Sequence, residues 1–425
     1  MNAPHPPFRV PTIIKRNMTL FALSQCFTGA GMSFAFGLGP LMVIALTGSA
    51  SLAGLSVGLI GLSRFLVSYP VGKITDTFGR KPGILLGLTL ALMGALITGS
   101  SMMVGSFAVL VAGMLVFGMG MNGAQQLRVA ATDMFPPNRR AQALGYLALG
   151  SLVGLVVSPL VIGASETAAK SLGQDPLGLP WFMLPILIVP GMIIISFVRP
   201  DPKEIGMNLE KYYPGYAPPK RANTVEGAKF QASSLWRDPQ LRLAILSNCA
   251  GQGNMSIVMV LTSLVLHHHG HTLTAIAMAH SFHSAGMFAF TIPLGKLCDR
   301  IGREKVMLPG IATSLVGAAL VAFTGDWWSV TLGTFLVGLG WAASNVAATA
   351  LIADRYATHE RGRAIGVNES FAGGTAVAMA LVTGPLVEYS GLPATGLVAV
   401  LIALPPLSIW LVRRIRGTTI QTQIP

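Results

Sequence analysis

The stretch Pro70-Val-Gly-Lys-Ile-Thr-Asp-Thr-Phe-Gly-Arg-Lys81 decides the fold, because the chain contains a second copy of it. That copy reads Pro293-Leu-Gly-Lys-Leu-Cys-Asp-Arg-Ile-Gly-Arg303. Six identical residues keep an offset of 223 positions, and they pair Pro70, Gly72, Lys73, Asp76, Gly79 and Arg80 with Pro293, Gly295, Lys296, Asp299, Gly302 and Arg303. Each copy lies between two apolar runs. The repeat therefore indicates an internal duplication.

The duplication extends beyond these loops. Gly113, Gly118 and Gly120 match Gly333, Gly338 and Gly340 at an offset of 220, and Asp133, Arg140 and Gly145 match Asp354, Arg361 and Gly366 at 221. The polar stretch between the halves is rich in proline and charge. We therefore predict an N-terminal six-helix bundle over 1–198, a cytoplasmic linker over 199–239 with one short helix near Phe230–Trp236, and a C-terminal six-helix bundle over 240–425.

Composition places both bundles in a membrane. Of the 425 residues 52% are hydrophobic and 11% are charged, whereas soluble domains carry about 25% charged residues. A helix needs about 20 apolar residues to cross a bilayer. We predict an all-α membrane protein of twelve transmembrane helices in two pseudo-symmetric bundles, with spans at 18–46, 52–72, 82–103, 106–127, 141–164, 177–198, 240–266, 272–295, 306–323, 328–351, 363–386 and 393–412.

The net charge of +13 is distributed as in an oriented membrane protein. Of 29 Lys and Arg residues, we place 27 in the termini or the even-numbered loops, with Lys170 in an odd-numbered loop and Arg64 inside a span. Such asymmetry puts both termini in the cytoplasm. It also excludes nucleic acid as the partner and favours the lipid bilayer.

The motif Gly72-x-x-x-Asp76-x-x-Gly79-Arg80-Lys81 resembles the signature between helices 2 and 3 of the major facilitator superfamily. The second copy would lie between helices 8 and 9, as in that superfamily. Thr77 departs from the pattern, which usually has a basic residue there, and Arg300 keeps it in the second copy. The resemblance implies a secondary transporter that works by alternating access, and not an enzyme. We also find no pairing of a nucleophile with a base.

The resemblance further implies a conformational latch that joins the halves while the cytoplasmic side is shut. Its residues would be Gly72, Asp76, Gly79, Arg80, Gly295, Asp299, Gly302 and Arg303. Glycines permit tight turns, and an aspartate can accept bonds from a helix N-terminus or an arginine. The alternative is that the basic residues of these loops only set the topology.

Ionisable residues inside spans are costly and usually functional. Arg64 lies about twelve residues into the second span, where it would bind an anionic group of a substrate or form a structural pair. We expect no Asp or Glu near the middle of a span, with Glu369 and Glu388 near the ends of the eleventh. Proton transport would then need His280 or His283.

Soft ligands gather in the seventh and eighth spans. Met255 and Met259 share one helix face, as do His283 and Met287, because residues four apart lie on the same side of a helix. Counting inward from the outer ends places the two pairs at similar depth. An isolated pair of this kind is usually packing. Two pairs on consecutive helices favour a metal site.

These pairs resemble the paired motifs of the CcoA-type copper importers, a family of bacterial inner-membrane proteins. The resemblance implies that Met255, Met259, His283 and Met287 bind copper, with His280 as a further ligand, and that copper is the transported substrate rather than a cofactor. We expect no resident cofactor and a monomeric protein.

Related members of that family import riboflavin, so the sequence leaves an organic solute open as the substrate. Such a solute needs several hydrogen bonds, which Arg64, Gln125 and Asn254 would supply. The coupling ion and the direction of transport stay undetermined at this stage.

Overall fold

The computed structural model describes residues 10–136, 140–214, 233–355 and 358–421, and these ranges contain twelve long helical segments and no strand. The predicted all-α fold of two six-helix bundles is confirmed. The first six segments are α1–α2 (Thr12–Thr28, Gly31–Thr47), η1–α3 (Ala50–Leu52, Leu55–Phe78), α4 (Arg80–Val104), α5–α6 (Phe107–Ala124, Gln126–Asp133), α7 (Arg140–Leu172) and α8–α9 (Leu179–Met183, Pro185–Ser196).

The second six segments are α13 (Pro239–His268), α14–α15 (Leu273–Ala289, Thr291–Ile301), α16 (Glu304–Phe323), α17 (Trp327–Arg355), α18 (Thr358–Ser390) and α19 (Leu392–Gln421). Within the described ranges, eleven helices are long and apolar enough to cross a membrane. The eighth segment, α14–α15, is not among these eleven. It is interrupted at Phe290, between the 17-residue α14 and α15.

Several spans continue further toward the ends that carry the termini than their apolar runs predict, and two of these matter for the candidate site. The fourth was predicted to end at residue 127, and its helix continues through α6 to Asp133. The eleventh was predicted to begin at residue 363, and α18 begins at Thr358. Hydropathy detects only the lipid-facing length of a helix, and a helix can continue where it faces water or protein. These extensions place two charged residues of the candidate site.

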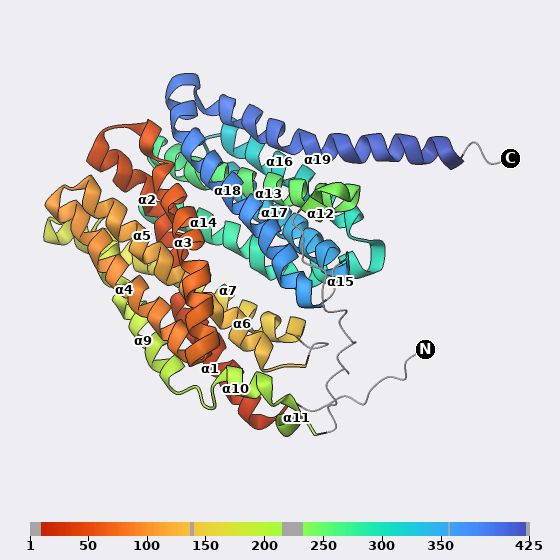
Figure 1. Ribbon diagram of the computed structural model, residues 1–425. Helices are drawn as coiled ribbons and strands as arrows, with labels where there is room; N and C mark the ends of the chain where they lie inside the picture. Colours follow the sequence, from red (N-terminus) through yellow and green to blue (C-terminus); the bar gives the residue numbers. More distant parts are fainter. Residues whose placement is uncertain (1–9, 137–139, 215–232, 356–357, 422–425) are drawn as a thin grey trace.

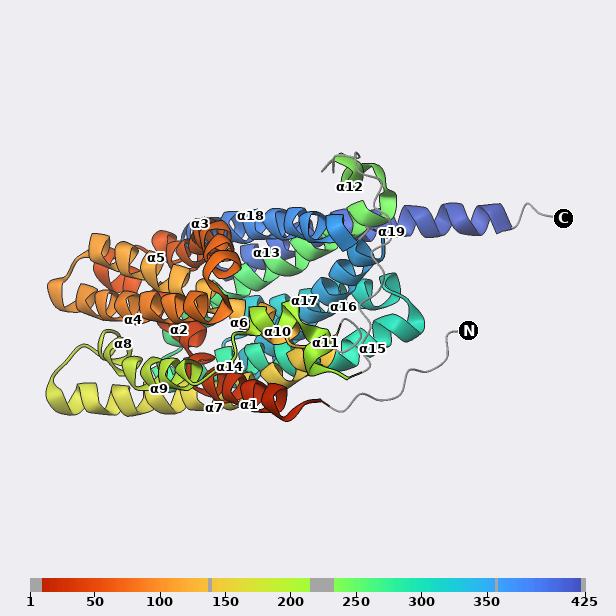
Figure 2. The same ribbon diagram turned by 60° about the horizontal axis from the view of Figure 1, so that its bottom comes forward.

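The described residues of the predicted linker form three short helices: α10 (Pro202–Met207), α11 (Leu209–Tyr212) and α12 (Ser233–Arg237). Only a helix near α12 was predicted. The first two pack beneath the N-terminal half, with α10 beside α6 (Figure 2). Tyr213 is fully buried there and its hydroxyl donates to the carbonyl of Met134 at 3.1 Å. Residues 215–232 lie outside the described ranges, and the division of the chain at 199–239 stays a prediction.

Matching glycines let neighbouring helices approach closely in each half. A Cβ on Gly120 of α5 would meet the backbone of Gly87 and Ala91 in α4. In the other half, a Cβ on Gly340 of α17 would meet the backbone of Gly310 in α16. Small residues at such crossings allow membrane helices to pack by van der Waals contact. The glycine repeat therefore reflects one packing solution that is used twice.

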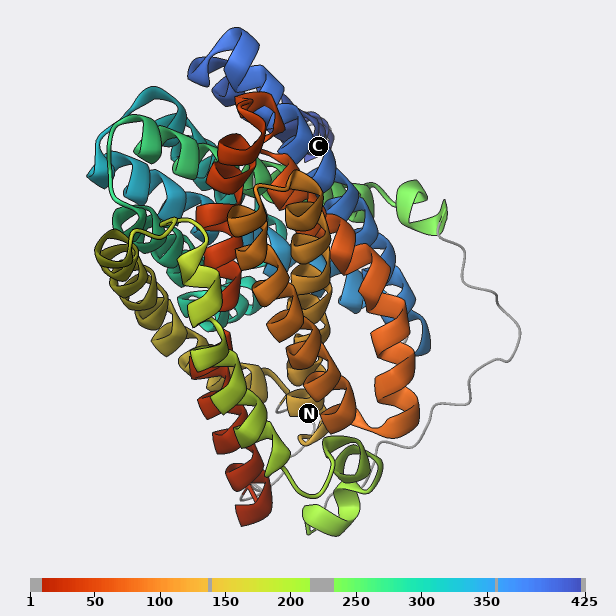
Figure 3. The ribbon, with the colours of Figure 1, turned by 90° about the vertical axis from the view of Figure 1, so that its left-hand side faces the viewer.

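The two halves meet at the end that carries the α13–α14 and α18–α19 connections, and they diverge toward the end that carries both termini (Figure 1). The first is the predicted outer end. There α3 lies along α18 (Figure 3), with a Cβ on Gly54 blocked by the carbonyl of Ala380. The two carboxylate contacts described next are also at this end.

Two carboxylates join the halves at the predicted outer end. Glu166 of α7 accepts a hydrogen bond from the hydroxyl of Thr274 in α14 at 3.2 Å. Glu388 of α18 accepts from the backbone N–H of Ser51 at 2.7 Å and also from the hydroxyls of Ser51 and Ser49. We call these two contacts the outer ties.

The outer ties are equivalent under the internal repeat. Glu388 follows Glu166 by 222 positions and Thr274 follows Ser51 by 223, within the offsets of the duplicated sequence. Each carboxylate comes from the fifth helix of one half and reaches the start of the second helix of the other. Glycine makes room for both, because a Cβ on Gly163 would meet Thr274 and one on Gly384 would meet Ser51. The internal duplication therefore accounts for two equivalent contacts that hold this end closed.

We predict that Glu166→Ala and Glu388→Ala loosen the outer end, and that the double variant loosens it most, because each removes bonds between the halves. Spin labels at Leu172 and Trp328, in a chain whose three cysteines are replaced by alanine, would report the separation. We expect a larger population of long distances than in the parent chain.

Asp175→Asn is the matched control. Its carboxylate lies at the same end but accepts only from Leu177 and Gly178 of its own loop among the described residues. A double variant with the same distance distribution as the parent would contradict a role for the outer ties in closure.

Candidate functional site

The duplicated loops form equivalent ion pairs within each half. Arg80 Nε lies 2.8 Å from Asp133 Oδ2, and Arg303 Nε lies 3.2 Å from Asp354 Oδ2. Gly79 and Gly302 have φ values of +107° and +100°, so each loop turns where only glycine is unstrained. A Cβ on Gly72 or Gly295 would meet nothing within 4 Å. The side chains of Asp76 and Asp299 lie outside the described part of the structure, and the latch stays a prediction.

Asp201 supports the first loop in a way that sequence reasoning missed. Its carboxylate accepts from the backbone N–H groups of Arg80 and Lys81, both at 3.0 Å, and so caps the N-terminus of α4. It also accepts from the N–H of Lys203 at 2.8 Å. A capping acid usually lies directly before its helix, whereas Asp201 is 121 residues away from Arg80. No local pattern could therefore have predicted the contact.

A cavity of about 70 Å³ that is partly open to solvent lies between the halves. Gln125, predicted to bind an organic substrate, is part of its wall, whereas Arg64 and Asn254 are not. The C-terminal half contributes Ser284 and Phe288 of α14 to the wall. The full lining comprises Gln25, Thr28, Gly29, Met32, Ser33, Ile84, Leu88, Met121, Ala124, Gln125, Leu127, Arg128, Ser151, Ser284 and Phe288.

Arg128 is the one charged residue among those that line this wall. It follows the predicted end of the fourth span at residue 127, which predicts a loop position, but it lies in α6, which continues that span. Its guanidinium carbon is 5.4 Å from the ring centroid of Phe288, on the other half. Arg64 is close enough to interact with it electrostatically. The expectation that Arg64 is the one arginine inside a span is therefore wrong.

Arg64 pairs with Glu369 across the two halves. Its Nη2 lies 3.3 Å from Glu369 Oε2, and the side chains are 56% and 32% exposed. We expected no carboxylate near the middle of a span, with Glu369 near an end of the eleventh. The apolar part of α18 that is able to cross a membrane begins at Val367, so Glu369 lies near its first residue, as expected. The helix itself begins earlier, and Glu369 lies eleven residues after Thr358 and 21 before Ser390.

Two amides complete the surroundings of this ion pair. Asn345 of α17 donates to Asn248 of α13 at 3.0 Å and to Glu369 at 3.4 Å, and Asn248 donates to Glu369 at 3.5 Å. Glu369 thereby joins three helices of its own half to Arg64 of the other. Asn254, by contrast, is fully buried, and neither atom of its amide has a partner among the described residues.

His283 has one nitrogen held and one available. Its Nδ1 lies 2.8 Å from the carbonyl of Thr334 in α17, and this contact makes Nδ1 the N–H donor. Nε2 then carries the lone pair, and within the described structure it has no partner although the ring is 1% exposed. A metal-binding histidine has this arrangement, with one nitrogen fixed by a backbone carbonyl.

The predicted sulfur ligands are buried on helices that both pack against α17. Met255 is 9% exposed, Met259 1% and Met287 8%. Met255 Sδ accepts from Gln252 Nε2 at 3.8 Å, and Gln252 in turn accepts from the indole of Trp341 in α17 at 2.7 Å. The role of Met255, Met259, His283 and Met287 as copper ligands stays a prediction.

His280 takes part in the contact between the halves. Its Nε2 lies 3.0 Å from the hydroxyl of Ser263, which also donates to the carbonyl of Phe36 in α2 at 3.0 Å. The neighbouring Gly37 leaves space for the imidazole ring. Its predicted role as a further metal ligand is untested, and its observed contacts are those of an interface residue.

Twelve helices in two related bundles, with a polar cavity between them, define a membrane transporter rather than an enzyme. The sequence pattern of the Major Facilitator Superfamily matches residues 21–247 and 243–422. The chain belongs to the Major Facilitator Superfamily, and it is an integral membrane protein.

Relatives along almost the whole chain include transporters. The riboflavin transporter RfnT of Brucella anthropi is 27% identical over 390 residues, which cover 89% of this chain and 91% of that protein. The uncharacterized MFS-type transporter YddS of Bacillus subtilis is 27% identical over 417 residues, which cover 96% and 94%.

Solved structures share the fold. The nucleoside transporter NupG superposes with a TM-score of 0.68 at 12% identity, covering 94% of this chain and 99% of that one. The D-xylose–proton symporter superposes with a TM-score of 0.66 at 14% identity, covering 93% and 97%. At this identity the likeness concerns the fold alone.

We predict that the Arg64–Glu369 pair contributes little to stability and much to turnover. In a double-mutant cycle of Arg64→Gln and Glu369→Gln, thermal unfolding in detergent should give a coupling below about 1 kcal/mol, because the pair is open to water. Transport should slow, because this pair joins the two moving halves.

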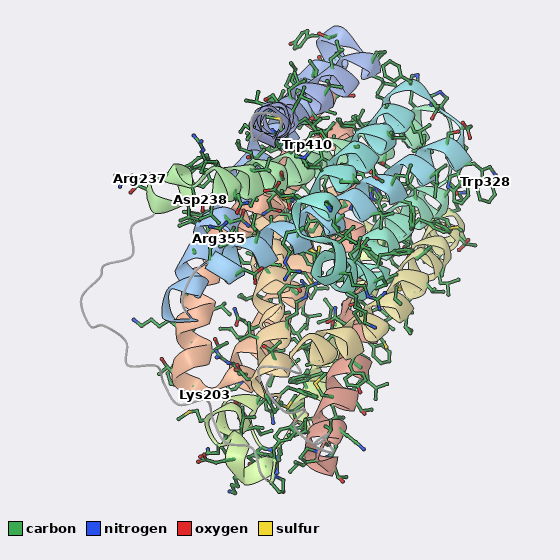
Figure 4. All side chains as sticks on the ribbon, turned by 90° about the vertical axis from the view of Figure 1, so that its right-hand side faces the viewer. Lys203, Arg237, Asp238, Trp328, Arg355 and Trp410 are labelled. Carbon is green, nitrogen blue, oxygen red and sulfur yellow. The ribbon has the colours of Figure 1, made fainter. Side chains whose placement is uncertain are left out.

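The Arg355–Asp238 pair, at 3.1 Å with 46% and 27% exposure, is the control within one half (Figure 4). A double-mutant cycle of Arg355 and Asp238 should give a similar coupling free energy, and these substitutions should leave the transport rate unchanged. A coupling of several kcal/mol for Arg64–Glu369 would mean that the pair is sealed from water.

Proposed function

We propose that the protein imports a small organic solute by alternating access, with riboflavin as the first compound to test. The observation that carries this proposal is the cavity between the halves, whose wall offers Gln25, Gln125, Arg128 and several hydroxyls. A solute of many atoms needs many such hydrogen bonds to fix its orientation. The similarity to RfnT, a riboflavin transporter, supports the choice of compound.

The proposed setting is the inner membrane of a bacterium, with both termini in the cytoplasm and the protein acting as a monomer. In that orientation the outer ties close the external side. The diverging ends give a bound solute access to the cytoplasm, as expected for the last stage of import.

Copper is the second candidate, for one specific observation: the buried Nε2 lone pair of His283 has no partner in the described structure. Cu(I) is a soft cation that prefers thioether and imidazole ligands. Met255, Met259 and Met287 would supply the thioethers. This candidate resembles the CcoA-type importers.

A side-by-side uptake assay separates the two candidates. Cells deficient in both uptake systems would express the protein and receive radioactive riboflavin or radioactive copper. We expect riboflavin accumulation, and we expect Gln125→Ala to weaken it about fivefold, because one hydrogen bond to a ligand contributes roughly 1 kcal/mol. Gln174→Ala, on the exposed outer loop, is the control. Copper accumulation without riboflavin accumulation would mean that the transported substrate is copper and not an organic solute.

We predict that Met255→Leu, Met259→Leu, His283→Leu and Met287→Leu leave riboflavin uptake within about twofold of the parent, because leucine preserves the apolar volume. The same four variants would each remove most copper uptake if these residues bind copper. Met93→Leu, at a half-exposed position on α4, controls for methionine loss as such. Normal copper uptake in all four variants would exclude the predicted copper site.

A further inference from the structure

Arg128 is a cation without a counter-ion in the described structure. Its contacts there are the face of Phe288 at 5.4 Å and the electrostatic influence of Arg64, which is repulsive. No carboxylate of the described residues lies within ion-pair distance of it. The guanidinium is nevertheless held inside the protein, against the cavity between the halves. A charge on a membrane-spanning helix usually faces a partner or a water-filled cavity.

Water in the open cavity solvates Arg128 in this conformation, in which the residue is accessible to solvent. Alternating access requires a stage in which the cavity closes on both sides. In that closed stage the guanidinium loses its water, and an unpaired cation at membrane depth becomes expensive. Something must neutralise it when the halves close.

The described charges near the cavity do not balance. Arg64 and Arg128 contribute two positive charges, and Glu369 contributes one negative charge that is already 3.3 Å from Arg64. These three side chains therefore carry one excess positive charge when the cavity is empty. A bound solute with one negative charge would balance it.

We infer that Arg128, with Arg64 beside it, forms an anion-binding subsite, so that a planar solute with a carboxylate or phosphate group binds more tightly than its neutral counterpart. This inference deepens the proposed function and rests on it. The guanidinium fork matches a carboxylate or a phosphate group in two parallel hydrogen bonds. The ring of Phe288, which already packs under the cation, offers an apolar face to a planar solute. Gln25 and Gln125 would hold its uncharged polar groups.

Glu369 competes with the solute in this arrangement. An anion that approaches Arg128 also approaches Arg64, and it must share that arginine with Glu369. Removal of the competing carboxylate should strengthen anion binding, whereas removal of the cation should abolish it. The two substitutions therefore act in opposite directions, which a general loss of folding would not produce.

The test measures thermal stabilisation of the purified full-length protein in detergent by pairs of compounds that differ in charge. Nicotinate with nicotinamide probes a carboxylate, and flavin mononucleotide with riboflavin probes a phosphate. We expect at least one anion to stabilise the protein more than its neutral partner. We expect Arg128→Gln to weaken binding of that anion at least tenfold and Arg128→Lys to weaken its binding less. We expect Glu369→Gln to strengthen its binding.

Arg237→Gln is the matched control, because Arg237 on α12 points away from the bundle and is exposed (Figure 4). Binding of the anion that is equal in the parent and in Arg128→Gln would overturn the inference and leave the proposed function standing. Anion binding that depends on Arg128, together with no riboflavin uptake, would support the inference and overturn riboflavin as the solute. No stabilisation by any anion of the set would also overturn the inference.

Discussion

The cost of an ionised side chain in hydrocarbon constrains this molecule more than any single contact. Lipid offers no hydrogen bonds, so a charge at membrane depth must face a partner or a water-filled cavity. Arg64 and Glu369 satisfy the rule by facing each other across the halves. Arg128 satisfies it by facing the cavity and the ring of Phe288. The cavity between the halves is therefore a place where the protein can hold an ionised side chain within the membrane. A ligand that enters the cavity comes close to the charge of Arg128.

The duplication explains how the same halves can close one end and open the other. Equivalent elements form the outer ties, with Glu166 on Thr274 and Glu388 on Ser51. Hydrogen bonds of this kind are individually modest, because water competes for the same groups. They can therefore break and reform during a transport cycle. Two equivalent weak contacts at opposite sides of one end hold two rigid bundles in register without fixing them permanently.

Sequence reasoning predicted the architecture because apolar length and an internal repeat are properties of the chain itself. It failed at the ends of helices. Arg128 lies just beyond the edge of an apolar run, yet it is on a helix that continues along the cavity. Glu369 lies near the edge of another run, on a helix that begins five residues before the predicted start at residue 363. Hydropathy measures contact with lipid, so it cannot distinguish a loop from a helix that faces water inside the protein. The contact of Asp201 with α4 was hidden for another reason, since it depends on how the chain returns after six helices.

Residues at equal membrane depth on consecutive helices do not by themselves define a binding site. The sequence placed Met255 and His283 at one level, but it could not give the rotation of each helix or the element between them. In the structure His283 is fixed by Thr334 of α17, and Met255 is linked through Gln252 to Trp341 of the same helix. Electrostatics adds a separate consideration. A copper cation that enters the cavity would approach two guanidinium groups and one carboxylate, and like charges repel most strongly where water is excluded. An organic anion would gain from the same field. The charge of the cavity therefore favours the solute whose sign opposes that of Arg128, whatever the ancestry of the methionine and histidine pairs.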